Sequence, residues 1–291
     1  MSAYRFCRSD DIQLLVDALN RCWAPYFPDE PLATPATFKR TIRNLQVWCS
    51  SCMVAFSGAD PIGVLIGAKR TSGTLIQKIA VHPEHRRQGH GRHLLTSLGS
   101  KLAILGPPRI VAEVPETLTD ASSLFSACGY VEEAVLTDYV LLRDQAAGAG
   151  GQEHPRSLGT GYERGLVIPI SVDDLAANSL LEADHLRTCW ERAVETLTAR
   201  KDDIAGLAVA SDERIEAYIL YIGDEIVGLR SFVEDDGARL MQLLGQLQAN
   251  GLETLRLAKV HPAEFSWGQL EALGFRPAGG HRLYATLARS Q

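Results

Sequence analysis

Apolar residues along the first half of the chain recur with two different spacings. Ile12, Leu15 and Leu19 follow one another at helical intervals, which predicts an amphipathic helix. Short apolar runs between turn-forming residues predict strands instead. This mixture of elements is typical of an α/β or α+β fold. The strands are predicted at 4–8, 53–56, 62–68, 75–81 and 110–114, with two more within 130–143, and the helices begin at 12 and 35 or lie at 93–105 and 119–127.

The second half of the chain repeats much of this order. Its strands are predicted at 166–170, 207–210, 215–222, 226–233, 255–260 and 283–287, and its helices at 175–200, 238–248 and 266–273. A repeat of this length suggests two copies of one structural unit. Residues 145–161 are rich in Gly, Ala and polar side chains and cannot bury a core, so they predict a linker. We therefore expect two domains, at 1–144 and 162–291.

Charge is distributed unevenly between the two halves. The 291 residues carry a formal net charge of −6. Residues 1–144 hold 15 basic and 14 acidic side chains, whereas residues 145–291 hold 14 and 21. The acidic second half argues against nucleic acid as a partner. No apolar run approaches the roughly 20 residues that cross a bilayer, and the N-terminus lacks a signal-peptide core, so we expect no membrane partner and a cytoplasmic location.

The cysteines and acidic clusters predict no metal site. Cys49 and Cys52 form an isolated C-x-x-C pair, whereas a structural metal site needs further ligands at matching spacing. The acidic run 234–236 has no histidine near it in the sequence. His82 and His85 lie close together, and a structural role in the exit from a strand is expected for both. Nothing in the sequence indicates an oligomeric state.

The segment 75–98 predicts an anion site. An apolar strand leads through a turn with Gly89 and Gly91 directly into a helix. The first amides of a helix lack intrahelical partners and lie at the positive end of its dipole, so such a turn can cradle a pyrophosphate. Arg86, Arg87 and Arg92 add positive charge. The turn lacks the Gly-Lys-Ser/Thr ending of a P-loop and the third glycine of a dinucleotide-binding turn.

This turn resembles the acyl-CoA signature of GNAT acetyltransferases, Gln/Arg-x-x-Gly-x-Gly/Ala, which reads Arg86-Arg87-Gln88-Gly89-His90-Gly91 here. The strand exit 79–84 and the helix end 121–130 are also similar to the family. The resemblance covers roughly residues 4–143. It implies a tandem of two GNAT-like domains, each a mixed, mostly antiparallel twisted sheet flanked by helices, with the signature only in the first.

The resemblance also implies a function and a set of contacts. The function is transfer of an acetyl group from acetyl-CoA, or of another acyl group, to a primary amine by direct attack in a ternary complex. Backbone groups of Ile79, Ala80 and Val81 are expected to bind the pantetheine arm. The amides from Arg87 and Gln88 to Arg92 are expected to bind the pyrophosphate, with the His90 side chain facing solvent.

Two departures from the family pattern affect the expected chemistry. Many relatives have a tyrosine that protonates the departing thiolate, and Phe125 stands at that position; an asparagine seven residues earlier is replaced by Leu118. A non-catalytic acyl-CoA sensor or scaffold is therefore an alternative. Glu113, on the strand 110–114, is the candidate general base, with His82 as the competing choice. In the second half Glu234-Asp235-Asp236 occupies the place of the signature, which predicts a degenerate domain without CoA.

Overall fold

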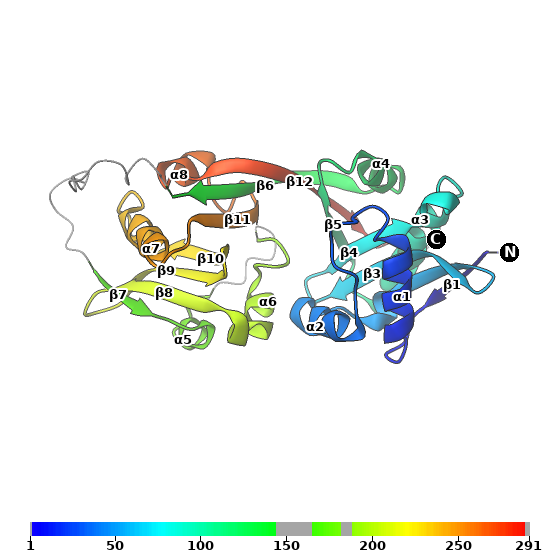
Figure 1. Cartoon of the computed structure of the whole chain (residues 1–291), viewed down its shortest axis with the longest axis horizontal. Helices are drawn as coiled ribbons and strands as arrows, with labels where there is room; N and C mark the ends of the chain where they lie inside the picture. Colours follow the sequence, from blue (N-terminus) through cyan, green and yellow to red (C-terminus); the bar gives the residue numbers. More distant parts are fainter. Residues whose placement is uncertain (1, 144–164, 182–187, 289–291) are drawn as a thin grey trace. The chain divides into compact units, whose positions relative to one another are not determined.

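The computed structural model describes residues 2–143, 165–181 and 188–288 and divides the chain into two compact units. Unit 1 comprises Met1–Leu136 and Gly280–Gln291, and unit 2 comprises Thr137–Gly279. Each unit is a mixed, mostly antiparallel sheet flanked by helices (Figure 1). The predicted fold class is therefore confirmed. None of the described helices is long and apolar enough to span a membrane.

Unit 1 has the strand order β1-β2-β3-β4-β5-β12, in which only β4 and β5 are parallel neighbours. Leu94, Leu95 and Leu98 of its central helix α3 are buried against Ile110 and Ala112 of β5. The elements, in chain order, are β1 (Ser2–Phe6), α1 (Ile12–Cys22), α2 (Pro35–Leu45), η1 (Cys49–Ser51), β2 (Met53–Ser57), β3 (Asp60–Lys69), β4 (Thr74–Val81), η2 (Pro83–His85), α3 (His90–Leu105), β5 (Arg109–Pro115), α4 (Thr119–Ala127), and parts of β6 (Val131–Leu142) and β12 (Arg276–Leu287).

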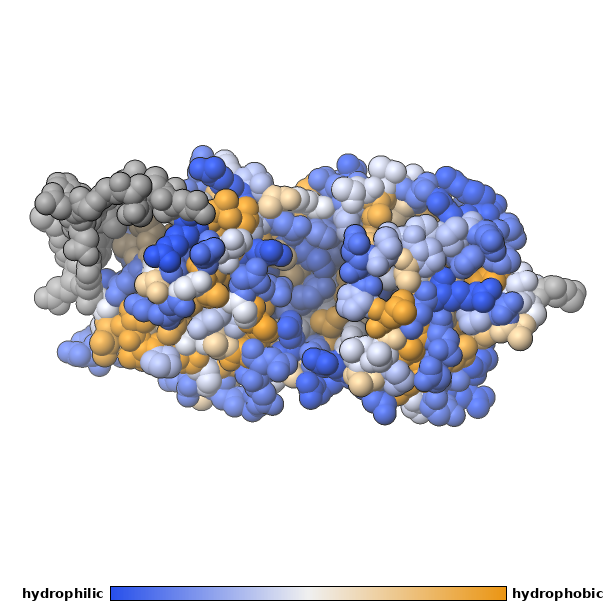
Figure 2. Space-filling model, viewed as in Figure 1, coloured by the Kyte–Doolittle hydropathy of each residue, from blue (hydrophilic) through white to orange (hydrophobic). Residues whose placement is uncertain are grey.

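Unit 2 repeats this plan with the strand order β6-β11-β10-β9-β8-β7, and β10 and β11 are its parallel pair. Leu243, Leu244 and Leu247 of α7 are buried against its sheet. Its elements are β7 (Leu166–Pro169), α5 (Val172–Ala177), α6 (Val194–Ala199), η4 (Lys201–Asp203), β8 (Ala205–Ala210), β9 (Ile215–Ile222), β10 (Glu225–Ser231), α7 (Ala238–Ala249), β11 (Thr254–Val260) and α8 (Trp267–Ala272). On the face shown in Figure 2, hydrophilic side chains are interspersed with hydrophobic patches on both units.

The division of the chain differs from the predicted domain boundaries. β6 is one strand, not two, and its residues from Thr137 onward pair with β11 of unit 2. The C-terminal strand returns to unit 1, where His281–Leu287 pairs with β5. A terminal strand pairs with any free edge of matching pattern, so hydrophobic periodicity does not reveal which sheet it joins. The predicted linker 145–161 lies outside the described residues.

The predicted long helix 175–200 is also replaced by shorter elements. α5 ends at Ala177, and Ser179 has a left-handed backbone with φ of 56°, which cannot continue a right-handed helix. The chain becomes helical again at Val194. Among the described residues between these helices, 178–181 and 188–193, no α-helix forms.

Candidate functional site

Strand β4 has one edge that the sheet of unit 1 leaves open. β4 pairs with β3 along its length but with β5 only at Thr74 and Leu75, so the two parallel strands diverge beyond that point. The His82 N–H donates to the Ile62 carbonyl at 2.9 Å. This bond makes Val81 and Gly63 a non-hydrogen-bonded antiparallel pair, and therefore the N–H and C=O of Val81 point away from β3.

The same alternation distinguishes the three predicted pantetheine contacts. The backbone groups of Ile79 face the open edge like those of Val81, because the two residues are two positions apart. Those of Ala80 are directed instead toward Val64 of β3. Ala80 therefore lies beside the open edge, but its backbone groups are not available for hydrogen bonds to a chain that binds there.

The turn after β4 places the start of α3 beside this edge. Gly89 caps α3 with φ of 85°, and Arg87 is also left-handed, with φ of 62°. At Gly89 a glycine avoids the strain that an L side chain meets in this region. The N–H groups of His90, Gly91 and Arg92 belong to the first turn and have no intrahelical acceptor. A Cβ at Gly91 would lie 2.9 Å from Leu124, so this glycine lets α4 approach α3 closely.

A cleft of about 600 Å³ joins the open edge to the start of α3. Nine of the ten predicted cofactor-binding residues line it, whereas Gln88 is exposed and does not. The start of α4 forms another wall. The segment between α1 and α2 adds aromatic side chains that the sequence interpretation had not singled out, namely Trp23, Tyr26 and Phe27.

The charge of this cleft is predominantly positive. Arg86, Arg87 and Arg92 line it, together with one acidic residue, Asp120. Asp120 forms ion pairs with Arg86 and, at 2.9 Å, with Arg87. The hydrogen bond from Arg86 lowers the pKa of the Asp120 carboxyl below its ordinary value. The ion pairs hold both guanidinium groups at the start of α4.

Tyr26 occupies part of the open edge. Its hydroxyl donates to the Val81 carbonyl at 2.6 Å, which is the acceptor that the alternation leaves facing the cleft. The segment carrying Tyr26 is held in place by Glu30, which accepts hydrogen bonds from the Trp23 indole at 3.0 Å and from Lys78 at 2.9 Å. An incoming chain that donates to the Val81 carbonyl therefore competes with the Tyr26 hydroxyl for this acceptor.

The prediction that His90 faces solvent is wrong. Its side chain turns inward from the first turn of α3, the residue is only 5% exposed, and Nδ1 lies 2.6 Å from the Tyr4 hydroxyl. Burial lowers the pKa of His90, and His85 and His93 lower it further. The apolar positions of α3 recur on this side, so position 90 belongs to the inner face of the helix.

His82 and His85 lie in the exit turn of β4, as expected. His82 Nδ1 lies 3.9 Å from Glu84, and donor atoms of His82, Glu84 and His85 lie within 4.8 Å of one another. Among the described residues, these two imidazoles and one carboxylate form a group whose donor atoms are of the types that bind a metal cation. The Glu84 side chain, however, is 81% exposed. The absence of a metal stays a prediction.

Glu113 and Phe125 lie outside the lining of the cleft. Glu113 is half-buried on β5, on the face opposite Ala112 and Val114, which pack in the core beneath α3. Phe125 is 2% exposed, and its ring stacks on Tyr284 with centroids 5.8 Å apart. Tyr284 comes from β12, so the C-terminal strand completes the core beside α4, which no local sequence pattern predicts.

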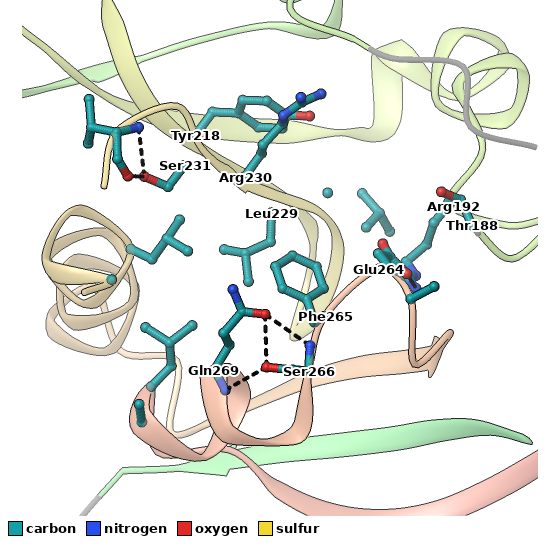
Figure 3. A pocket seen from close by; sticks show the side chains of 18 of the residues that line it. Thr188, Arg192, Tyr218, Leu229, Arg230, Ser231, Glu264, Phe265, Ser266 and Gln269 are labelled. Atoms are coloured by element: carbon teal, nitrogen blue, oxygen red, sulfur yellow. Dashed lines mark hydrogen bonds and ion pairs between the residues drawn. The ribbon is translucent and has the colours of Figure 1, made fainter. Parts of the chain in front are cut away.

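Unit 2 contains a second cleft, of about 960 Å³, in the corresponding place (Figure 3). β10 pairs with β11 only at Glu225, and the two strands diverge beyond it. The Phe232 N–H donates to the Glu216 carbonyl at 2.7 Å, which makes Ser231 and Ala217 a non-hydrogen-bonded pair. The backbone groups of Ser231 and Leu229 therefore face an open edge, as those of Val81 and Ile79 do in unit 1.

The helix start of this second cleft is already filled by a carboxylate. Gly237 caps α7 with φ of 81°. Asp235 accepts hydrogen bonds from the N–H of Gly237 at 3.1 Å and from that of Arg239 at 2.8 Å, and it is 6% exposed. A side chain of the chain itself thus occupies the position where a helix start would hold a phosphate.

Comparison with known proteins agrees with this geometry. Residues 48–132 match the family model described as Acetyltransferase (GNAT) domain. Unit 1 therefore carries a GNAT domain, as the signature predicted, and this match together with the fold supports an acyltransferase enzyme. Comparison with curated proteins gives no match.

Several solved structures share the fold along the whole chain. A tandem GNAT protein from the clavulanic acid biosynthesis pathway is 16% identical, with 100% of both chains covered and a TM-score of 0.64. A GCN5-related N-acetyltransferase from Sphaerobacter thermophilus is 15% identical, with 99% of this chain and 96% of that chain covered and a TM-score of 0.64. A putative acetyltransferase from Pyrococcus horikoshii is 14% identical, with 99% and 90% covered and a TM-score of 0.62. At these identities the likeness concerns the fold, including the tandem arrangement.

Proposed function

We propose that the protein is a CoA-dependent N-acyltransferase that moves an acetyl group from acetyl-CoA to a primary amine of a small molecule or peptide. One observation carries the proposal: the open edge of β4 and the free amides of α3 face the same cleft, which is lined by three arginines. The proposal includes a cytoplasmic location, where the free cysteines would stay reduced. It includes no nucleic acid, membrane or metal.

The cleft suits the two chemically different parts of CoA. The pantetheine arm contains amides, and the backbone groups of Ile79 and Val81 offer it the hydrogen bonds of an added strand. The pyrophosphate is anionic, and the first amides of α3 with Arg86 and Arg92 offer it donors and positive charge. The acyl group would then lie toward the point where β4 and β5 diverge.

The reaction needs an unprotonated amine and a leaving thiolate. The amine nitrogen attacks the thioester carbon, the carbon–sulfur bond breaks, and CoA departs as a thiolate. We assign the amine proton to Glu113, acting through water, because it lies on β5 beside the divergence. Phe125 has no proton to give, so water protonates the thiolate in this proposal.

The presence of Phe125 in place of the tyrosine found in many relatives also supports a second candidate function, a non-catalytic acyl-CoA sensor. Phe125 is buried and stacked in the core, so it supplies no polar group to the cleft. A cleft that binds acyl-CoA without turnover would fit this feature.

Calorimetry and turnover assays separate these possibilities. Purified protein is titrated with CoA and acetyl-CoA and then incubated with acetyl-CoA and a panel of primary amines while free thiol is measured. The enzyme proposal expects one bound CoA per chain and thiol release that depends on an amine. Binding without release, for acetyl-CoA and other acyl-CoAs alike, supports the sensor. Absence of binding rejects the site.

A further inference from the structure

The cleft of unit 2 keeps the open strand edge but not the anion site. Leu229 and Ser231 present backbone donors and acceptors to it, and no strand within the described residues pairs with this edge of β10 beyond Glu225. Asp235 occupies the amides of α7. A phosphate at that place would meet a buried carboxylate at close range and lose the donors it needs. The cleft therefore keeps the open strand edge, which binds amides, and lacks the free helix amides that bind an anion.

The charges around this cleft favour a cation. Its charged lining consists of Arg192, Arg230 and four acidic residues. Arg192 binds both carboxylate oxygens of Glu264 at 2.6 Å, so these two charges compensate each other. Glu234 and Asp236 are exposed and form no ion pair with a described residue. Two carboxylates therefore remain available at the α7 end of the open edge.

Apolar side chains line the cleft as well. Figure 3 shows Leu229 and Phe265 between the wall with Tyr218 and the wall with Ser266 and Gln269. Strand addition needs such a surface, because backbone hydrogen bonds supply affinity while alternate side chains enter pockets beside the edge.

We propose that the cleft of unit 2 binds an extended peptide segment bearing a positive charge, which adds to the Leu229–Ser231 edge of β10 and places its cation beside Glu234 and Asp236. This site is distinct from the CoA cleft of unit 1. A pantetheine arm has similar amides, but the pyrophosphate attached to it in CoA would meet Asp235.

The test uses the full chain with CoA present in excess, so that the cleft of unit 1 is filled. Fluorescence anisotropy measures the binding of a labelled, capped six-residue peptide of alternating valine and threonine with a lysine at one end. We expect saturable binding and at least a tenfold weaker affinity when glutamate replaces that lysine. N-methylation of alternate peptide amides should abolish binding, because it removes the donors that strand addition needs.

Variants of unit 2 locate the site. Ser231→Pro removes an N–H at the open edge that β9 does not use, and we expect at least a tenfold loss of peptide affinity. Ser231→Ala, which keeps this N–H, should bind as the wild type does. Glu234→Gln with Asp236→Asn should weaken the lysine peptide and reduce its advantage over the glutamate peptide.

Three results would overturn the proposal: no binding of the lysine peptide, equal binding of the N-methylated peptide, or displacement of the peptide by further CoA. The last result would show that the cleft of unit 2 binds CoA. Titration of CoA against each variant reports on unit 1 separately, and circular dichroism of each variant recognises one in which unit 2 fails to fold.

Discussion

The two units differ less in their backbone than in the charges placed on it. β4 and β10 have an irregularity at the same place, diverge from their parallel neighbour just before it, and expose the same alternate backbone groups. Each leads through a left-handed glycine, Gly89 or Gly237, into a helix. An open strand edge that can bind an extended, amide-bearing chain is therefore present in both units.

The difference lies at the helix start. In unit 1 the amides of α3 are free and arginines surround them, whereas in unit 2 the carboxylate of Asp235 satisfies the amides of α7. Unit 2 thus supplies its own anion. The comparison teaches that a shared fold specifies where a ligand chain runs, and that a few charged residues at the turn decide what that ligand is.

The largest effect is expected when the turn of unit 1 is made acidic like that of unit 2. Gly89→Glu introduces a negative charge where the pyrophosphate is expected, and we predict at least about a 100-fold loss of CoA affinity, or about 2.7 kcal/mol. Calorimetry measures the loss. Gly58→Glu is the matched control, because Gly58 also has a positive φ and open space around it but does not line the cleft. CoA binding by Gly89→Glu at wild-type strength would reject the site.

The second prediction concerns the base. By the strand registers, Glu113 on β5 of unit 1 corresponds to Ala258 on β11 of unit 2. Unit 2 therefore has no carboxylate at the position of the proposed base. Glu113→Gln should lower kcat by about tenfold or more and leave CoA affinity unchanged, since a general base typically contributes about 10²–10⁴. His82→Asn should change kcat little. Steady-state kinetics with an accepted amine measures both. The opposite pattern would assign the proton to His82, and little effect in either would assign it to water.

The parts that the sequence predicts well are those specified by local residue types. Segment 75–98 indicates its strand, its turn and its helix because Gly89, Gly91 and the apolar spacing act within a few residues. The repeated element order follows from the same local patterns. The match of residues 48–132 to the GNAT family agrees with this interpretation.

The parts that were missed depend on contacts between distant residues. The pairing of β12 with β5, the inward turn of His90 toward Tyr4, and the bond from Tyr26 to Val81 join residues far apart in the sequence. Asp235 was interpreted as a source of repulsion, whereas it also caps α7, because a carboxylate two residues before a helix cap can reach the first amides. The hydrogen-bonded alternation that separates Ala80 from its neighbours requires the register with β3.

The third prediction tests Asp235 as an internal anion. Asp235→Ala leaves two amides of α7 without their acceptor, and we expect a loss of about 1–2 kcal/mol in the free energy of unfolding. Glu234→Ala, which changes an exposed neighbour, should cost less than about 0.5 kcal/mol. Inorganic pyrophosphate should raise the melting temperature of Asp235→Ala more than that of the wild type. An equal response would mean that the position does not accept an anion.

The fourth prediction concerns Tyr26, whose hydroxyl competes with an incoming pantetheine arm for the Val81 carbonyl. Tyr26→Phe removes a hydrogen bond worth about 1 kcal/mol in the free protein, so CoA should bind about fivefold more tightly. Calorimetry gives the ratio, and Tyr221→Phe in unit 2 controls for loss of a hydroxyl elsewhere. Weaker binding by Tyr26→Phe would mean that the hydroxyl contacts CoA instead of competing with it.

The smallest effect is expected from His90, which unit 2 replaces with Ala238 at the same place after the capping glycine. The pKa of His90 is lowered from 6.5 by burial and by two neighbouring histidines, so the folded chain keeps this imidazole neutral while the unfolded chain takes up a proton. The resulting stabilisation is complete above the ordinary pKa and is lost as the pH falls through the lower, folded pKa. Between about pH 7.5 and about pH 5.5, the melting temperature of His90→Asn should therefore fall less than that of the wild type. The difference between the two decreases should be on the order of 1–2 °C. Calorimetric scans at the two pH values measure the difference, with His261→Asn in unit 2 as the control. An identical loss in His90→Asn and wild type would show that His90 does not set the acid sensitivity of unit 1.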